Sequence, residues 1–400
     1  MSSERWDRFY ALRPLEPTPP GAPATWQPVP ARRTSATACP PAGGLRVGSG
    51  MNPANRARLL CCALLPMLAM AAAPAAAGGA PVPLRLGVVG DSDSHAYHDS
   101  LHFDGSRGHR GGEYHASTLQ WTEALQRLRG RWIDQGAWAR HGLPGAVGTL
   151  AAWLDLPARA PAKEDFEYNF AVSGARCQSL MGGERQLPQL VRLMDEAPAQ
   201  WRGGVVLVRI GVNSFGQRDS LERLAGDPRD RALSDEIDAC IGAVGEAVAF
   251  LHRHHPATRV VLVGIFDNSN IGDDAATVRP PRALANIAAA LDRYDDALRA
   301  MAAADARIAF FDDRAWFAGL WGGRTPGGVP AYRDVRVAGR FRVANSQGDA
   351  PVNAVLADGH AGTAWNALWA RALVDLLNRR FDAGIPPVEE SEVLPLLRTR

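Results

Sequence analysis

Four residues that lie far apart in the sequence are of the types needed for acyl transfer to a serine. Ser92 ends the tripeptide GDS, Gly174 lies in NFAVSGARC, Asn213 lies in VRIGVNSF, and His360 lies in LADGHAGTAWNALWA. A serine hydroxyl is a weak nucleophile until a base accepts its proton, and histidine titrates near neutral pH, so His360 could activate Ser92. A glycine N–H and an uncharged asparagine amide could donate to the oxyanion of a tetrahedral intermediate. Each short pattern is also common in turns. The positions of these residues relative to the predicted strands and helices must therefore decide whether they form a site.

The elements around these residues predict an α/β fold. Short apolar, β-branched runs alternate with amphipathic segments of helical length, which is typical of βαβ units and a parallel sheet. We expect a three-layer α/β/α sandwich with a central parallel sheet of about five strands. The predicted strands cover residues 84–92, 167–172, 204–211, 258–266 and 307–312, and the predicted helices cover 118–129, 186–194, 233–254, 283–304 and 363–381, with Ser234 and Thr363 as N-caps.

This order of elements brings the four candidate residues to one edge of the sheet. Ser92, Gly174 and Asn213 each follow a predicted strand, and His360 precedes the last predicted helix. In an open parallel sheet the carboxyl ends of the strands line one crevice, so the four residues could converge there. Two stretches that lack the alternation, 93–117 and 320–355, are expected to be loops that shape a substrate cleft.

Taken together and in order, the four blocks resemble those of the SGNH/GDSL hydrolases of the secreted bacterial type. The resemblance covers roughly residues 84–381 and implies a flavodoxin-like α/β/α fold and hydrolysis of an ester or a related acyl bond. It implies that Ser92 is the nucleophile, His360 the general base and Asp358 the third member of a triad. It also implies an oxyanion hole made by the N–H groups of Ser92 and Gly174 and the amide of Asn213. No metal, nucleotide or organic cofactor is needed.

The histidine block departs from the family's pattern. The family usually has aspartate three residues before the histidine, whereas Ala357 stands there and Asp358 lies two before. A shift of one residue could turn the carboxylate away from the imidazole. Two further departures, Ala361 for the usual proline and Ser214 for a frequent aspartate, remove no reacting group.

These residues leave two functions open. A third, a flavin-binding domain of flavodoxin type, would need a phosphate-binding loop, and none is visible in the sequence. We expect a serine ester hydrolase that cleaves an acyl or acetyl ester of a small molecule, a polysaccharide or a lipid. The alternative is a catalytically weakened protein of the same fold that binds glycans or other ligands in the same cleft. The position of Asp358 favours that alternative.

The N-terminal part of the chain has the pattern of an export signal. Arg56 and Arg58 precede an apolar run over 59–73, and Ala75–Ala77 offer small residues for cleavage. We therefore expect a secreted or periplasmic protein without stable membrane insertion after cleavage, although an uncleaved anchor helix is the alternative. The expected divisions are 1–50, a disordered extension or a stretch ahead of the true start; 51–77, the signal peptide; 84–381, the hydrolase domain; and 382–400, a C-terminal tail.

Several other residue groups could serve either structure or function. The formal net charge of +2 gives no reason to expect a nucleic-acid partner. Cys177 and Cys240 could form a disulfide after export or stay as separate thiols. Trp316 and Trp321 could stack on a sugar or line an acyl pocket, while core packing is expected of Trp365 and Trp369. A loop cluster suggests a metal site, but we expect loop histidines and no metal; its members are His95, His98 and His102, with His109 and His115 behind.

Overall fold

A computed structural model describes residues 82–144, 147, 148, 150 and 158–398. The predicted N-terminal extension and signal peptide lie outside the described residues. The described part belongs to one compact unit that starts at Ala80. None of its helices is both long enough and apolar enough to cross a membrane.

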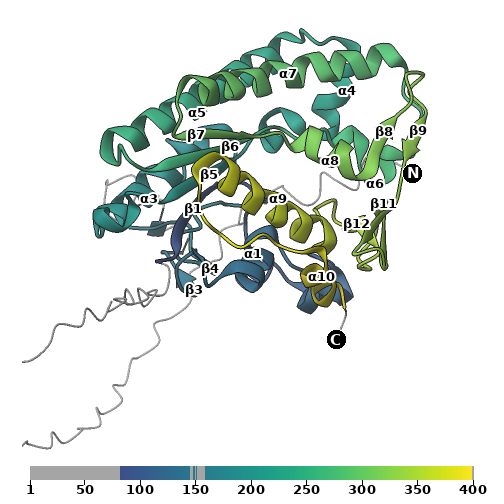
Figure 1. Cartoon of the computed structure of the whole chain (residues 1–400). Helices are drawn as coiled ribbons and strands as arrows, with labels where there is room; N and C mark the ends of the chain where they lie inside the picture. Colours follow the sequence, from purple (N-terminus) through teal and green to yellow (C-terminus); the bar gives the residue numbers. More distant parts are fainter. Residues whose placement is uncertain (1–81, 145–146, 149, 151–157, 399–400) are drawn as a thin grey trace, which may run out of the picture. The chain divides into compact units, whose positions relative to one another are not determined.

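A five-stranded, all-parallel sheet forms the centre of this unit (Figure 1), as predicted. The segment Val205–Val208 shows why these runs form strands, because its β-branched and leucine side chains are buried on both faces. The strands, in their order across the sheet, are β2 (Ile133–Asp134), β1 (Leu84–Gly90), β5 (Val205–Arg209), β6 (Arg259–Val263) and β7 (Ile308–Phe311).

Helices cover both faces of the sheet (Figure 1), and alternate strand residues point into two separate cores. Val205 and Leu207 belong to one core, and Val206 and Val208 to the other. The first core includes α1 (Trp121–Arg129), α8 (Asp313–Trp321) and α9 (Thr363–Phe381), and the second includes α3 (Gln186–Asp195), α4 (Arg218–Gly226), α5 (Arg231–His254) and α7 (Pro281–Ala304). The three-layer α/β/α sandwich is therefore confirmed.

Both predicted N-caps are wrong by a few residues. Helix α5 begins at Arg231, and the side chain of Asp230 accepts a hydrogen bond from the Leu233 N–H. Gly362 precedes α9, so Thr363 is its first residue. The Thr363 hydroxyl instead accepts from the Leu119 N–H at 3.1 Å, a tertiary contact that the local sequence does not encode.

The predicted strand over 167–172 is also wrong. Only an isolated parallel bridge joins Asn169 to Val88, although the Phe170 N–H donates to the Val88 carbonyl and the Val172 N–H donates to the Gly90 carbonyl. The segment therefore runs along β1 without a regular ladder, and the two-residue strand β2 supplies the fifth strand. The segment 167–172 is preceded in sequence by an antiparallel pair of strands, β3 (Trp138–His141) and β4 (Lys163–Phe166).

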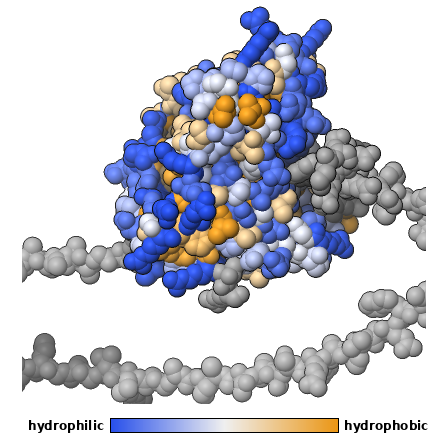
Figure 2. Space-filling model, turned by 90° about the vertical axis from the view of Figure 1, so that its right-hand side faces the viewer, coloured by the Kyte–Doolittle hydropathy of each residue, from blue (hydrophilic) through white to orange (hydrophobic). Residues whose placement is uncertain are grey.

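The stretch 320–355, expected to be a loop, contains two small sheets. Figure 2 shows the side of the molecule on which β8, β9 and β11 lie in Figure 1, with hydrophilic residues over most of it and apolar residues in separate groups. One sheet pairs β8 (Gly322–Arg324) with β9 (Pro330–Tyr332), and the other joins β10 (Val335–Val337), β11 (Phe341–Gln347) and β12 (Asn353–Val355), with the short helix α6 (Gly272–Ala275) against β11.

The segment after Phe381 packs against the first core instead of extending from it. It contains α10 (Glu390–Val393), and Ile385, Val388 and Leu397 are buried. The buried guanidinium of Arg129 donates to the Pro386 carbonyl and to Glu392. These contacts tie residues 382–398 to the end of α1.

Candidate active site

The turn that carries Ser92 is held tightly at the end of β1. The side chain of Gln186 bonds both the N–H and the carbonyl of Gly90, at 2.7 and 2.8 Å. A Cβ on Gly90 would lie 2.2 Å from the Arg209 carbonyl oxygen, so only glycine fits beside β5. The chain then turns, with the Ser94 and His95 N–H groups both donating to the Asp91 carbonyl at 3.1 Å. Ser92 lies in this turn and is 4% exposed.

Hydrogen-bond donors suited to an oxyanion lie on the three segments that follow the strands. Within the described residues, neither the Ser92 N–H nor the Gly174 N–H donates to a protein acceptor. Gly174 has φ +84, which favours glycine, and a Cβ there would meet open space. The Asn213 amide donates to the Ala175 carbonyl at 3.0 Å, which leaves its second N–H unused and joins its loop to that of Gly174.

The candidate base and carboxylate form a pair despite their unusual spacing. Oδ1 of Asp358 lies 3.1 Å from Nδ1 of His360 and also accepts from the His360 N–H at 3.2 Å. Gly359, at φ +86, lets the chain reverse between the two residues. Burial alone would raise the pKa of Asp358, but the His360 ring and the neighbouring Arg110 guanidinium hold that pKa well below its usual range.

The loop of His360 is hydrogen-bonded to the segment that follows Ser92. The Tyr97 hydroxyl donates to the Ala361 carbonyl at 2.9 Å. Further along, the Gln120 amide donates to the Ser92 carbonyl at 3.3 Å, and the neighbouring Leu119 N–H donates to the first residue of α9. Among the hydrogen bonds of the described residues, none joins the Ser92 hydroxyl to the His360 ring. The loops are thus adjacent, and the serine–histidine contact stays a prediction.

A model of the GDSL-like lipase/acylhydrolase family matches residues 71–328, more than half of the chain. The chain belongs to this family. Membership makes it, at the level of the family, a hydrolase of acyl esters. The match ends before Asp358 and His360, so the assignment of these two residues depends on the geometry described above.

Among solved structures, the chain is similar to an extracellular lipase from Streptomyces rimosus. The two are 17% identical with a TM-score of 0.31, over 62% of this chain and 86% of the lipase chain. No match was found among curated proteins.

In this family member, a buried histidine supports the loop of Gly174 from behind. The Ser173 N–H donates to Nδ1 of His95 at 3.0 Å, and Nε2 of His95 lies 2.7 Å from Oδ2 of Asp99. Burial, and then the charge of Lys163, lower the pKa of His95 to about 4, so its ring is neutral at neutral pH. Because Nδ1 accepts, Nε2 carries the proton and donates to Asp99.

The same tautomer decides how the histidine cluster is interpreted. His95, Asp99 and His102 have their ligand atoms within 4.8 Å of one another. A metal would need the lone pair of Nε2 on His95, and that nitrogen carries the proton. Asp99 also receives His102 Nδ1 at 2.8 Å and the Leu101 N–H at 2.9 Å. The donor set therefore fits an internal hydrogen-bond network better than a metal site.

The two further histidines next to this cluster have other partners. Nδ1 of His98 pairs with Glu123 at 2.7 Å, and Nδ1 of His115 lies 3.2 Å from the Arg110 carbonyl. The cluster thus contains Asp99 in place of His98. The spacing of the histidines in the sequence did not indicate that an aspartate belongs to it.

Arg110 is a site residue that the sequence analysis missed. It is 4% exposed, its Nη1 lies 2.8 Å from Oδ2 of Asp358 and 2.5 Å from Nδ1 of His360, and its Nη2 donates to the Ser173 hydroxyl at 3.3 Å. Its local sequence, GHRGGE, is a glycine-rich loop in which an exposed arginine is the ordinary expectation. No single-sequence signal marks it as buried.

The structure also shows the state of the two cysteines and the surroundings of Trp321. Cys177 and Cys240 form a disulfide that ties the segment after Gly174 to α5. Trp321 is 0% exposed and stacks on Trp365 in the first core, so the expected sugar or acyl contact is wrong for Trp321.

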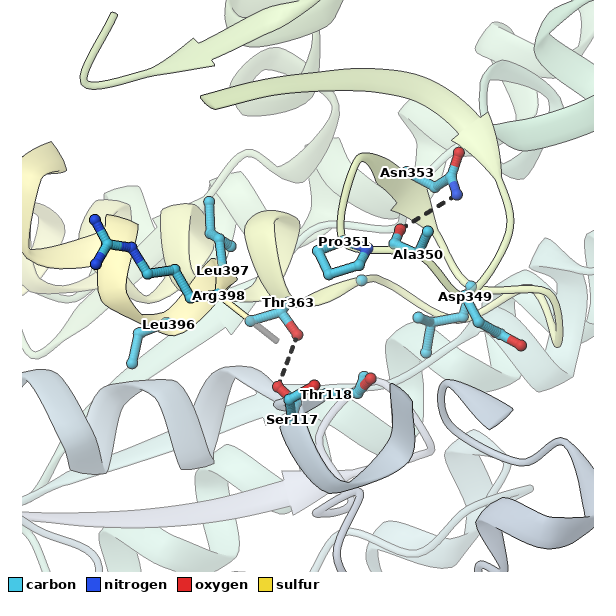
Figure 3. Close-up of a pocket in the computed structure, with 12 residues that line it drawn as sticks. Ser117, Thr118, Asp349, Ala350, Pro351, Asn353, Thr363, Leu396, Leu397 and Arg398 are labelled. Atoms are coloured by element: carbon cyan, nitrogen blue, oxygen red, sulfur yellow. Dashed lines mark hydrogen bonds between the residues drawn. The ribbon is translucent and has the colours of Figure 1, made fainter. Parts of the chain in front are cut away.

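A pocket lies behind the histidine loop and not at the candidate active site. Figure 3 shows it between the turn at Ser117, the loop at Asp349 and the C-terminal segment. None of Ser92, Gly174, Asn213 and His360 lines it. Its wall residues include Ser117, Thr118, Asp349, Ala350, Pro351, Asn353, Thr363, Leu396, Leu397 and Arg398.

Proposed function

We propose that this protein is a serine ester hydrolase in which Ser92 is the nucleophile, His360 the general base and Asp358 the residue that orients the imidazole. One observation carries the proposal. A carboxylate lies 3.1 Å from Nδ1 of His360, on a loop hydrogen-bonded to the segment after Ser92, while the N–H groups of Ser92 and Gly174 have no acceptor among the described residues. With Nδ1–H donating to Asp358, Nε2 keeps its lone pair for the serine proton.

The proposed reaction has two halves. Ser92 Oγ bonds to the ester carbonyl carbon as its proton moves to Nε2 of His360, and the oxyanion accepts from the Ser92 and Gly174 N–H groups and the Asn213 amide. The carbon–oxygen bond to the alcohol then breaks, and the imidazolium protonates the leaving oxygen. Water attacks the acyl-serine with His360 again as base, which releases the acid and restores Ser92.

The substrate is proposed as an acyl or acetyl ester of a small molecule, a polysaccharide or a lipid. The alternative, a weakened family member that only binds ligands, drew its support from the shifted position of Asp358. Because Asp358 contacts His360 despite the shift, its position no longer favours the alternative, and we propose hydrolysis.

Secretion or a periplasmic location is also proposed. Two observations support it: the signal-like sequence over 51–77 and the disulfide between Cys177 and Cys240. Disulfides form and persist chiefly in oxidising compartments.

Turnover of p-nitrophenyl acetate by the purified protein tests the hydrolase proposal. Ser92→Ala is expected to reduce kcat on the order of 10⁴-fold or more, because no other group can form the acyl-enzyme. Ser106→Ala, an exposed serine in a nearby loop, is the matched control and should keep wild-type kcat. Absence of Ser92-dependent turnover of this ester and of longer-chain p-nitrophenyl esters would contradict the proposal.

A further inference from the structure

We infer that Arg110 is a positioning residue of this active site: it holds Asp358 in register with His360 and links that pair to the loop of Gly174. The inference rests on the proposed hydrolase mechanism. It explains how an aspartate two residues before the histidine can still orient the ring.

The first step is the division of the Asp358 carboxylate between two partners. Oδ2 accepts from both the backbone N–H and Nη1 of Arg110, at 3.0 and 2.8 Å. Oδ1 is left for His360, whose backbone N–H and Nδ1 both face it. The two Arg110 donors hold Oδ2 and the His360 N–H holds Oδ1, so together they fix the orientation of the carboxylate, which the two-residue spacing alone does not determine.

The second step is that Arg110 itself is held rigidly. Its guanidinium carbon lies 4.2 Å from the centre of the Phe103 ring and 5.4 Å from that of Tyr97. Its backbone is left-handed, at φ 49, and is followed by Gly111 and Gly112, which also have positive φ. A non-glycine residue in this conformation is strained, and the contacts of this side chain must offset that strain.

The third step is the contact between the guanidinium of Arg110 and the imidazole of His360. Nη1 of Arg110 lies 2.5 Å from Nδ1 of His360, and Nδ1 cannot donate to Asp358 and accept from Arg110 at once. The proposed mechanism requires the tautomer in which Nδ1–H points toward Oδ1. In that tautomer Nη1 donates to Oδ2, and the guanidinium lies beside the ring as a fixed cation.

Other titratable groups lie around Arg110, Asp358 and His360. The Tyr97 hydroxyl bonds the carbonyl after His360, and Asp349 accepts from the Ala357 N–H. His109 also feels the charges of Arg110 and Asp358, and burial, followed by Arg110, lowers the pKa of His109. Arg110 is thus the buried cation in direct contact with the ring.

A fourth contact links the base to the oxyanion loop. Nη2 of Arg110 donates to the hydroxyl of Ser173, the residue just before Gly174. One guanidinium therefore touches the carboxylate, the imidazole and the loop of an oxyanion donor. Loss of Arg110 should disturb the chemical step more than substrate binding.

The test compares Arg110→Gln with Arg110→Lys, using p-nitrophenyl acetate. Arg110→Gln should lower kcat about tenfold to a hundredfold with little change in KM, because the chemical step loses its alignment. Arg110→Lys keeps a charged donor near Asp358 but loses the planar fork that reaches Asp358 and Ser173 together, so it should recover part of the kcat that Arg110→Gln loses.

A double-mutant cycle keeps the inference testable if Arg110→Gln also lowers stability. In an Asp358→Asn background, Arg110→Gln should lower kcat much less than it does alone, because the partner it holds is already changed. Wild-type kcat in folded Arg110→Gln would overturn the inference. Equal effects of Arg110→Gln in both backgrounds would overturn it as well. Ser92-dependent turnover of the wild type shows separately whether the hydrolase mechanism holds.

Discussion

The two sides of the candidate active site are built in different ways. The donors from Ser92 and Asn213 follow strands β1 and β5, and that of Gly174 follows a segment bonded to β1. Hydrogen bonds to the main chain, such as those from the Gln186 side chain to Gly90, place these donors. The base side, with Arg110 and His360, depends on side-chain contacts between two loops that are 250 residues apart in sequence. The donor side should therefore tolerate the loss of one side chain better than the base side.

Between the two sides, the larger effect is expected on the base side, from Asp358→Asn. An asparagine cannot act as an anionic partner of His360, and it leaves the buried charge of Arg110 without its carboxylate. A fall in kcat on the order of 10³–10⁴-fold is expected, measured with p-nitrophenyl acetate at pH 7. Asp349→Asn, which changes a carboxylate of the same loop, is the control and should lower kcat less than tenfold. Similar losses in the two variants would show that Asp358 has no special role.

A smaller effect is expected on the donor side, from Asn213→Ala. One oxyanion donor disappears while two backbone N–H groups remain, so kcat should fall on the order of 10²–10³-fold, or about 2.7–4 kcal/mol, with KM nearly constant. Asn286→Ala is a matched control, because Asn286 also donates to a backbone carbonyl, that of Ala225, away from the site. A decrease below tenfold for Asn213→Ala would remove this residue from the oxyanion hole.

The same contrast explains what the sequence could predict. The sheet, the two helical layers and the places of Ser92, Gly174 and Asn213 follow from periodicity and from the rule that strand ends meet at one edge. The predicted strand over 167–172 failed because its main chain meets β1 through only a few bonds. Short strands within 320–355 have too few residues for a period to show.

The base side could be predicted only in part. The sequence block around His360 made it a candidate, but the contact of Asp358 depends on the reversal at Gly359 and on an arginine from a distant loop. Burial of Arg110 comes from tertiary contacts with aromatic rings, which local composition does not report. Likewise, the segment 382–398, which packs on the first core, has no long periodic pattern of its own.

The smallest effect on turnover is expected from His95→Gln. This substitution also tests how the donor side is supported. Burial lowers the pKa of His95 to about 4, whereas an unfolded histidine titrates near 6.5. The unfolded chain therefore takes up a proton first as the pH falls. The stability that His95 contributes is complete above about pH 6.5 and is lost between pH 6.5 and 4, by up to about 3 kcal/mol.

Urea unfolding between pH 7 and pH 4.5 measures this loss when wild type is compared with His95→Gln. Glutamine can still accept from the Ser173 N–H and donate to Asp99 without titrating, so the variant should lose less stability on acidification and keep kcat within about tenfold. His98→Gln is the control of opposite sign. The hydrogen bond to Glu123 raises the pKa of His98, so its contribution is complete below about pH 6.5 and is lost as the pH rises. If His95→Gln follows the wild-type pH dependence, a neutral buried imidazole does not support the loop of Gly174.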